Sequence, residues 1–188
     1  MLVINIGTLD AKAYDNIVLQ ASKKPNVHGT LYYLKDHIYL RKPTPTTNFG
    51  VWSNPTNPNV LATANPKLVI EDVEFSEELK LLVQAINKDR KGADVFQFKP
   101  LDGKFYIAFA KNLPLVPPQH ELMYCIAVYG VFVQKSSQTA FLQMEVCEVS
   151  FKPIRLLGSW PSSSPQETNK SWTTEVEGEN EYSEDTVW

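Results

Sequence analysis

The chain has 188 residues, of which 43% are hydrophobic and 11% aromatic, and its 18 basic and 21 acidic residues give a net charge of −3. This length fits one domain, or one domain with a tail, and the composition supplies enough apolar side chains for a core. No apolar run reaches the length of about 18 residues that a membrane helix needs, so we expect no membrane span. The N-terminus lacks a basic segment followed by a long apolar block, so we also expect no signal peptide.

The charge is divided unevenly along the chain. Residues 159–188 carry seven acids and one base, a net charge of −6, which leaves 17 bases and 14 acids in residues 1–158, a net charge of +3. A mildly basic body followed by an acidic tail is typical of proteins that handle nucleic acids. We therefore expect a domain over 1–158 and a flexible tail over 159–188, which has too few apolar residues to fold alone.

The N-terminal part predicts short strands at 2–6 and 16–20, with a turn-like segment between them and a loop carrying Lys23 and Lys24 after them. Residues 30–42, TLYYLKDHIYLRK, predict one bent strand or a tight hairpin. If the strand is continuous, alternation separates Tyr32, Leu34, Ile38 and Leu40 from a second face that carries Tyr33, Lys35, His37, Tyr39 and Arg41.

Rings interleaved with cations on one strand face suit a single-stranded nucleic acid, because bases stack on rings and phosphates attract cations. The alternative is an ordinary amphipathic strand with exposed tyrosines.

Residues 43–66 contain five prolines, which predicts a long loop. Its aromatic residues, Phe49 and Trp52, either contact a ligand or partner or hold the loop against the core. A strand is expected at 67–75, followed by an amphipathic helix at 77–90 with Ser76 as its N-cap.

Two acidic groups lie near the start of this helix, and we interpret both as capping and solvated residues rather than as a metal site: Glu71, Asp72 and Glu74, and Glu77 and Glu78. Residues 95–111 predict a hairpin that turns at Pro100–Gly103 and places Phe105, Ile107 and Phe109 on one face.

The stretch 121–151 predicts a long hairpin with strands at 122–133 and 140–151. The apolar phase of the second strand slips by one residue after Val146, which indicates a β-bulge. Gly130 lies inside the first strand, which indicates a sharp bend or the close approach of another backbone. Bent and bulged strands favour a small closed barrel, with a β-sandwich as the alternative. The two cysteines, Cys125 and Cys147, lie in opposite arms, and we expect buried, reduced thiols and a cytoplasmic protein.

Catalytic and metal-binding patterns are missing from the sequence. None of the three histidines, His28, His37 and His120, has the spacing of a metal ligand, and no glycine-rich phosphate loop occurs. We expect no catalytic residues, no metal and no cofactor, and therefore a protein that is not an enzyme.

Four segments carry a resemblance to a known family: DGKFYIAFAKNLPLVPP (102–118), VYGVFVQ (128–134), AFLQMEVCEVSF (140–151) and the tail EVEGENEYSEDTVW (175–188). Together they resemble the OB-fold single-stranded DNA-binding proteins of phages and viruses. The resemblance implies a mainly β protein built on a five-stranded Greek-key barrel with one α-helix. It also implies sequence-tolerant binding of single-stranded DNA during replication or recombination in the host-cell cytoplasm, with no membrane partner and with homo-oligomers possible.

On this interpretation the tail recruits replication proteins such as a polymerase or a helicase, through Glu184, Asp185 and Trp188. We expect the residues that bind DNA to be Lys23, Lys24, Tyr33, Lys35, Tyr39, Arg41, Lys42, Trp52, Lys104 and Lys135. Five of these cations are expected to line one basic groove: Lys23, Lys24, Arg41, Lys42 and Lys135. The alternative class is a structural or protein-interaction protein whose tail docks a partner.

Overall fold

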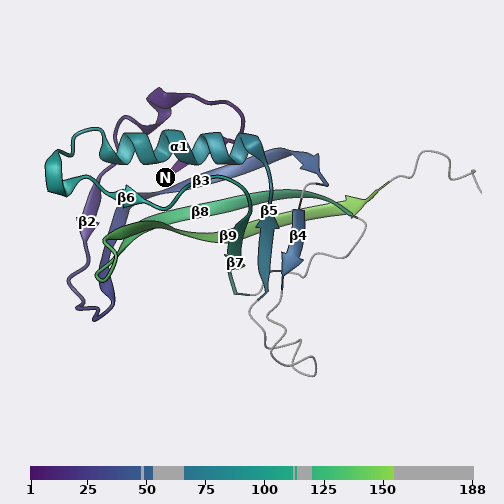
Figure 1. Cartoon of the computed structure of the whole chain (residues 1–188). Coiled ribbons are helices and arrows are strands. Elements are labelled where there is room, and N and C mark those ends of the chain that lie inside the picture. The colour runs from purple at the N-terminus through teal and green to yellow at the C-terminus, as the bar shows by residue number, and fades with distance from the viewer. Residues whose placement is uncertain (48, 53–65, 112, 114–119, 155–188) are drawn as a thin grey trace, which may run out of the picture. The chain divides into compact units, whose positions relative to one another are not determined.

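The computed structural model describes residues 1–47, 49–52, 66–111, 113 and 120–154, and the acidic tail lies outside this range (Figure 1). The fold given below is that of the compact unit Met1–Pro153. The domain boundary expected at residue 158 also lies outside the described residues.

The described chain is mainly β-sheet with a single α-helix, as the sequence predicts. The α-helix is α1 (Val73–Asn87), and a short 3-10 helix spans Ala11–Tyr14. The nine described strands are β1 (Leu2–Asn5), β2 (Leu19–Ala21), β3 (Gly29–Thr46), β4 (Phe49–Trp52), β5 (Lys67–Ile70), β6 (Gln97–Phe98), β7 (Phe105–Phe109), β8 (His120–Gln134) and β9 (Thr139–Pro153).

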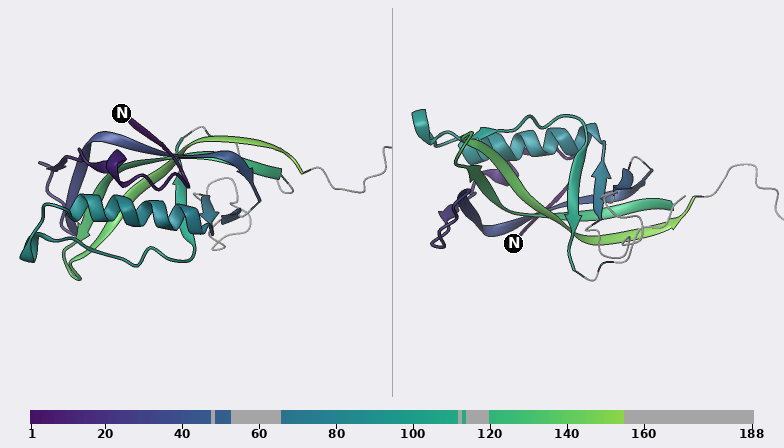
Figure 2. Two further views of the ribbon diagram at one scale, coloured as in Figure 1. Left: turned by 90° about the horizontal axis from the view of Figure 1, so that it is seen from above. Right: turned by 60° about the horizontal axis from the view of Figure 1, so that its bottom comes forward.

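All nine strands belong to one sheet with the order β1-β3-β8-β9-β7-β5-β4, to which β2 adds beside β3 and β6 beside β9. The long strands β3, β8 and β9 form its antiparallel centre, whereas β1 is parallel to β3, and β6 and β7 are both parallel to β9. Figure 1 shows β4 and β5 running steeply to β8 and β9, and Figure 2 shows the curvature of the long strands. Within the described residues the sheet is open, with β1 and β4 at its ends, so the pairing does not show a closed five-stranded barrel.

The long C-terminal hairpin is confirmed, and so are its two predicted irregularities. Cys125 pairs with Glu148 and Ile126 with Val146, which leaves Cys147 as the extra residue of a β-bulge. At Gly130, an added Cβ would lie 2.3 Å from the carbonyl oxygen of Tyr32. The glycine therefore permits the close backbone approach that the sequence indicated.

The segment 30–42 forms one continuous strand, and β3 extends beyond it to Thr46. The predicted separation of its faces is confirmed, since Leu34, Ile38 and Leu40 are buried while Tyr33 is exposed. The predicted loop at 43–66 is wrong for its first part, because residues 43–46 belong to β3 and residues 49–52 form β4. Pro43 and Pro45 lie in an irregular stretch of β3, between the residues Lys42 and Thr46 that pair with β8. Regular hydrogen bonding is interrupted there, so the N–H groups that proline lacks are not needed.

The helix begins four residues earlier than predicted, at Val73, because Asp72 is its N-cap. The Asp72 carboxylate accepts a hydrogen bond of 2.9 Å from the backbone N–H of Glu74. Ser76, the predicted cap, lies in the first turn, and its hydroxyl donates instead to the carbonyl of Leu101.

The predicted hairpin at 95–111 is wrong. Strands β6 and β7 do not pair with each other, and each runs parallel to a different part of β9. The turn between them packs toward α1, where Lys80 bonds Asp102 at 2.8 Å. The predicted face of β7 is nevertheless confirmed, because Ile107 is buried and Phe105 packs on Phe75 of α1.

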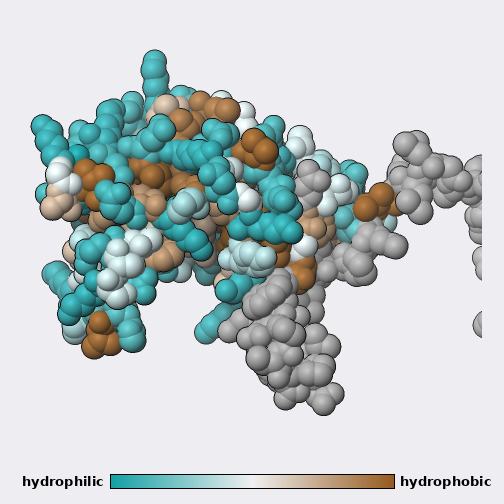
Figure 3. Space-filling model, viewed as in Figure 1, coloured by the Kyte–Doolittle hydropathy of each residue, from teal (hydrophilic) through white to brown (hydrophobic). Residues whose placement is uncertain are grey.

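The hydrophobic core lies between α1 and the inner face of the sheet and includes two buried tyrosines, Tyr14 and Tyr124. Among the described residues, Lys42, Ser76 and Glu78 are also buried. On the side seen in Figure 3, hydrophilic residues dominate and apolar residues form separate patches. No helix among the described residues has the length and apolar character needed to cross a membrane.

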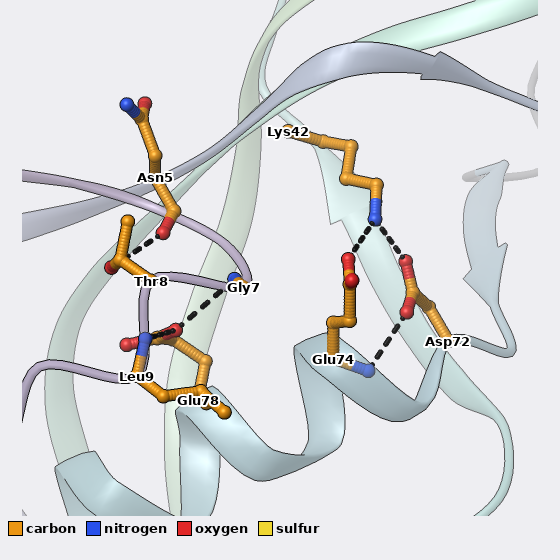
Figure 4. A network of polar contacts seen from close by, with 8 residues as sticks. All are labelled: Asn5, Gly7, Thr8, Leu9, Lys42, Asp72, Glu74 and Glu78. Atoms are coloured by element: carbon orange, nitrogen blue, oxygen red, sulfur yellow. Dashed lines mark hydrogen bonds and ion pairs between the residues drawn. The ribbon is translucent and has the colours of Figure 1, made fainter.

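Glu78 departs most clearly from the sequence-based interpretation, because it is fully buried rather than solvated. Its carboxylate accepts hydrogen bonds from the backbone N–H groups of Gly7 and Leu9 at 3.3 Å (Figure 4). It also accepts a hydrogen bond from the Tyr14 hydroxyl at 2.8 Å. Burial, and then the hydrogen bond to Glu78, raise the pKa of Tyr14. The carboxylate therefore attaches the N-terminal loop to α1.

Candidate nucleic-acid interface

The face of β3, β8 and β9 that points away from α1 is called the outer face here. Phe75 of α1 packs on Tyr124 with ring centroids 6.4 Å apart, which fixes the opposite, inner face. Side chains alternate along a strand, and directly paired residues share a face. The register therefore places these residues on the outer face: Tyr33, Tyr39, Arg41, Cys125, Ala127, Gly130, Phe132, Phe141, Gln143, Glu145 and Glu148. His37 and Tyr129 lie in register shifts and join this face through their ring contacts, and Lys35 joins it because it alternates with the buried Leu34.

An aromatic cluster lies at the middle of this face. The His37 ring lies 6.5 Å from that of Tyr39 and 6.4 Å from that of Tyr129, and Tyr33 is 43% exposed. Burial, and then the nearby Glu145, raise the pKa of Tyr129. Tyr129 was not among the site residues predicted from the sequence. The glycine that follows it was the available signal, because it indicates that the alternation of side chains in β8 breaks at this point.

Small residues occupy the outer face of β8 between the larger side chains of β3 and β9. Gly130 has no side chain, and Ala127 and Cys125 are buried at 4% and 6% exposure. No long side chain rises from these three positions, whereas Tyr129 and Phe132 carry rings elsewhere on the outer face of β8.

The charge on the outer face changes sign across the sheet. Lys35 and Arg41 lie on β3, whereas Glu145 and Glu148 lie two strands away on β9. A phosphate chain gains from the cations and is repelled by the carboxylates. We therefore expect phosphate contacts on the β3 side of the outer face.

The predicted basic cations divide into two groups. Lys135 lies beside the loop that carries Lys23 and Lys24, because its backbone N–H donates to His28 O at 2.9 Å. Arg41 lies near the other end of β3, where it pairs with Cys125. Gly29 pairs with Gln134 and Arg41 with Cys125, and these partners are nine residues apart, which is roughly 30 Å along an extended strand.

Lys42 differs from the other candidates because its side chain is buried. Its ammonium lies 2.8 Å from Asp72 and 2.6 Å from Glu74, at the start of α1 (Figure 4). Burial opposes the charged form, but the hydrogen bonds to the two carboxylates outweigh it and raise the pKa of Lys42. This ammonium neutralises the acids at the helix start and is not presented on the outer face.

Replacing Lys42 by Met is expected to lower the free energy of unfolding by about 2 kcal/mol, because the buried Asp72 carboxylate loses its charged donor. Urea denaturation checks the value. The matched control is Lys35→Met on the same strand, which removes an exposed ammonium and should change stability by no more than about 0.5 kcal/mol. Equal effects of the two substitutions would contradict the structural role of Lys42.

The other predicted residues lie elsewhere. Trp52 ends β4, where its backbone pairs with Lys67. Lys104 is exposed near β7 and lies 3.7 Å from the Glu71 carboxylate. The predicted partner-binding residues Glu184, Asp185 and Trp188 are outside the described residues.

The two cysteines are both free, and they lie together at the bulge of β9. Cys125 is buried as predicted, whereas Cys147 is only half-buried, and its thiol donates to Cys125 O at 3.3 Å. Burial, and then the neighbouring Cys147, raise the pKa of Cys125 to about 12. This thiol is therefore a poor nucleophile near neutral pH.

A search of the described residues for clusters of three or more His, Cys, Asp or Glu side chains able to hold a metal ion finds none. Comparisons with models of protein families, with curated proteins and with solved structures give no match.

Proposed function

We propose that this chain binds single-stranded DNA on its outer face with little dependence on sequence, and so protects exposed strands during replication or recombination. The observation that carries the proposal is the aromatic cluster of His37, Tyr39 and Tyr129 beside the exposed Tyr33, with Lys35 and Arg41 on the same strand. Rings offer stacking platforms to any base, and cations contact the phosphates.

We further propose that the domain is an open variant of the OB-fold. Five strands form a continuous series, β3-β8-β9-β7-β5, with α1 between β5 and β7 in the chain. The edge of β5 that faces away from β7 pairs with β4, which follows β3 in the chain, so the first strand of the series reaches the last one only through β4. OB-folds are partly open barrels. The strand order and the single helix support this assignment.

The acidic tail completes the proposal. Residues 171–188 carry six acids and no base and end on Trp188. An aromatic residue that fills a pocket, with carboxylates that meet basic residues at the rim, is a common way to bind a protein partner. We propose that the tail recruits replication proteins through Glu184, Asp185 and Trp188.

Fluorescence anisotropy with labelled oligo-dT tests the outer face through single substitutions. Tyr33→Ala should weaken binding by about 1–3 kcal/mol because it removes a stacking ring, whereas the matched Tyr33→Phe keeps the ring and should bind like the parent. Lys35→Met should reduce the salt dependence of log K by about one unit of slope. If the folded Tyr33→Ala protein binds oligo-dT as tightly as the parent, the aromatic cluster does not stack on bases. A protein-interaction role would then explain the exposed rings better.

A further inference from the structure

The edge of β9 that faces β6 and β7 is paired at two places and open between them. β6 pairs with Thr139 and Ala140, and β7 pairs with Glu145 and Val146. No described strand pairs with residues 141–144 on this side. This open stretch, Phe141–Met144, is called the β9 window.

The window presents unpaired backbone groups. Ala140 O accepts the N–H of Lys99 at 3.1 Å, and Val146 O accepts the N–H of Ala110 at 2.9 Å. Peptide groups point to alternate sides along a strand, so the N–H and C=O of Leu142 point into the window as well. No described strand pairs with them there, so Leu142 presents one donor and one acceptor at the window.

A pocket of about 340 Å³ lies at the window. Apolar side chains from β6, β7 and β9 line it, among them Phe98, Ile107, Leu142 and Met144. Ligand pockets begin at roughly 300 Å³, so this one has room for a single small ring system rather than for a larger ligand.

The turn between β6 and β7 forms one wall of this pocket, through Pro100, Leu101 and Asp102. The hydroxyl of Ser76 donates to Leu101 O, and Lys80 bonds Asp102 at 2.8 Å, so α1 fixes this turn at two points. These contacts attach this wall of the pocket to the helix.

The part of the pocket lining that belongs to the outer face is aromatic, and it is called the mouth of the pocket. Phe141 lies on the outer face, and so does Tyr106, because it alternates with Phe105, which packs on α1. Tyr106 is 51% exposed. Lys99 and Lys104 also line the pocket and are exposed, with Lys104 3.7 Å from Glu71.

The register connects this mouth to the aromatic cluster. Tyr33 pairs with Gly130, and Gly130 pairs with Gln143, which lies within the window. Neighbouring strands are about 4.8 Å apart, so Tyr33 and Gln143 are separated by roughly 10 Å across a position that has no side chain. A chain that crosses the sheet along this row meets cations at both ends: Lys35 on β3, and Lys99 and Lys104 at the window.

We propose that the β9 window is a nucleobase-binding subsite, into which one base of a bound single strand inserts. The inference rests on the proposed function and adds a specific path, from Tyr33 over Gly130 to the window. The base lies between Tyr106 and Phe141 at the mouth and enters the apolar pocket. The peptide of Leu142 offers it one donor and one acceptor, and Lys99 and Lys104 contact the flanking phosphates.

Two measurements test this subsite. In the first, oligo-dT carrying one 5-iodouracil is photo-crosslinked to the full-length wild-type chain, and the modified peptides are located by mass spectrometry. Crosslinks at Tyr106 or within residues 141–144 are expected. Crosslinks confined to β3 and β8 would overturn the proposal.

In the second measurement, Met144→Trp fills the pocket and should weaken oligo-dT binding about tenfold, because one base loses its site. The control Val73→Trp adds the same ring at an exposed position of α1 and should bind like the parent. Unchanged affinity of a folded Met144→Trp protein would also overturn the subsite. If Met144→Trp does not fold, the crosslinks on the wild-type chain decide alone.

The two proposals fail separately. If the wild-type chain does not bind oligo-dT, the proposed function fails and the subsite fails with it. If the wild-type chain binds but crosslinks only outside the window, the subsite fails and the outer face remains.

Discussion

Glu78→Ala is expected to lower the free energy of unfolding by about 3–5 kcal/mol, because it leaves one buried and two partly buried donors without their acceptor. These donors are the Tyr14 hydroxyl and the N–H groups of Gly7 and Leu9, and the carboxylate itself has no exposed surface. In a chain of this length the loss corresponds to a fall in Tm of roughly 10 °C. Calorimetry or denaturation followed by circular dichroism measures it.

Two tyrosines provide a matched control for this prediction. Tyr14→Phe removes a hydroxyl that donates to Glu78 and should cost about 1–2 kcal/mol. Tyr124→Phe removes a buried hydroxyl that has no hydrogen-bond partner among the described residues and should be neutral or slightly stabilising. If Glu78→Ala were as stable as the parent, or if the two Tyr→Phe variants behaved alike, the buried carboxylate would not have the role assigned to it.

Gly130→Ala should cost about 3 kcal/mol, because the new Cβ would lie 2.3 Å from the backbone oxygen of Tyr32. The contact is with the backbone of the neighbouring strand, so no side-chain rotation relieves it, and β3 and β8 must separate locally. The loss of stability is measured by urea denaturation.

Gly50→Ala is the control, since its Cβ would meet only Val69 at 3.8 Å, an ordinary contact distance. This variant should change stability by less than about 0.5 kcal/mol, or raise it slightly, because alanine restricts the unfolded chain. Equal stabilities of Gly130→Ala and Gly50→Ala would show that β3 and β8 do not approach each other as described.

Local patterns in the sequence predicted several parts of this fold. The phase slip after Val146 predicted the bulge at Cys147. Because one face of the strand is buried, a change of register shifts the positions of the apolar residues in the sequence. The alternation in 30–42 predicted which side chains of β3 are buried, and hence the exposed Tyr33 and Lys35 of the candidate site. Each of these features depends on residues close together in the chain.

Long-range partners were not predictable in the same way. The turn residues at 100–103 favour a hairpin over 95–111. The structure instead pairs β6 and β7 with β9, in parallel, and this pairing depends on residues about 40 positions away. Glu78 and Lys42 carried no local signal of burial, since their partners lie 64 and 30 residues away in the chain. The pocket at the β9 window was not predictable for the same reason. It lies where β6 and β7, which are distant from β9 in the chain, leave part of β9 unpaired.

The most direct test of the central claim is a titration of the wild-type chain into labelled oligo-dT and into a duplex of equal length, repeated over a series of salt concentrations. We expect clear preference for the single strand, because stacking on Tyr33 and its neighbours requires unpaired bases. We also expect log K to fall linearly with log salt, because phosphates on Lys35 and Arg41 release counterions. Equal affinity for duplex and single strand, or an affinity for oligo-dT that does not change with salt, would contradict binding on the outer face.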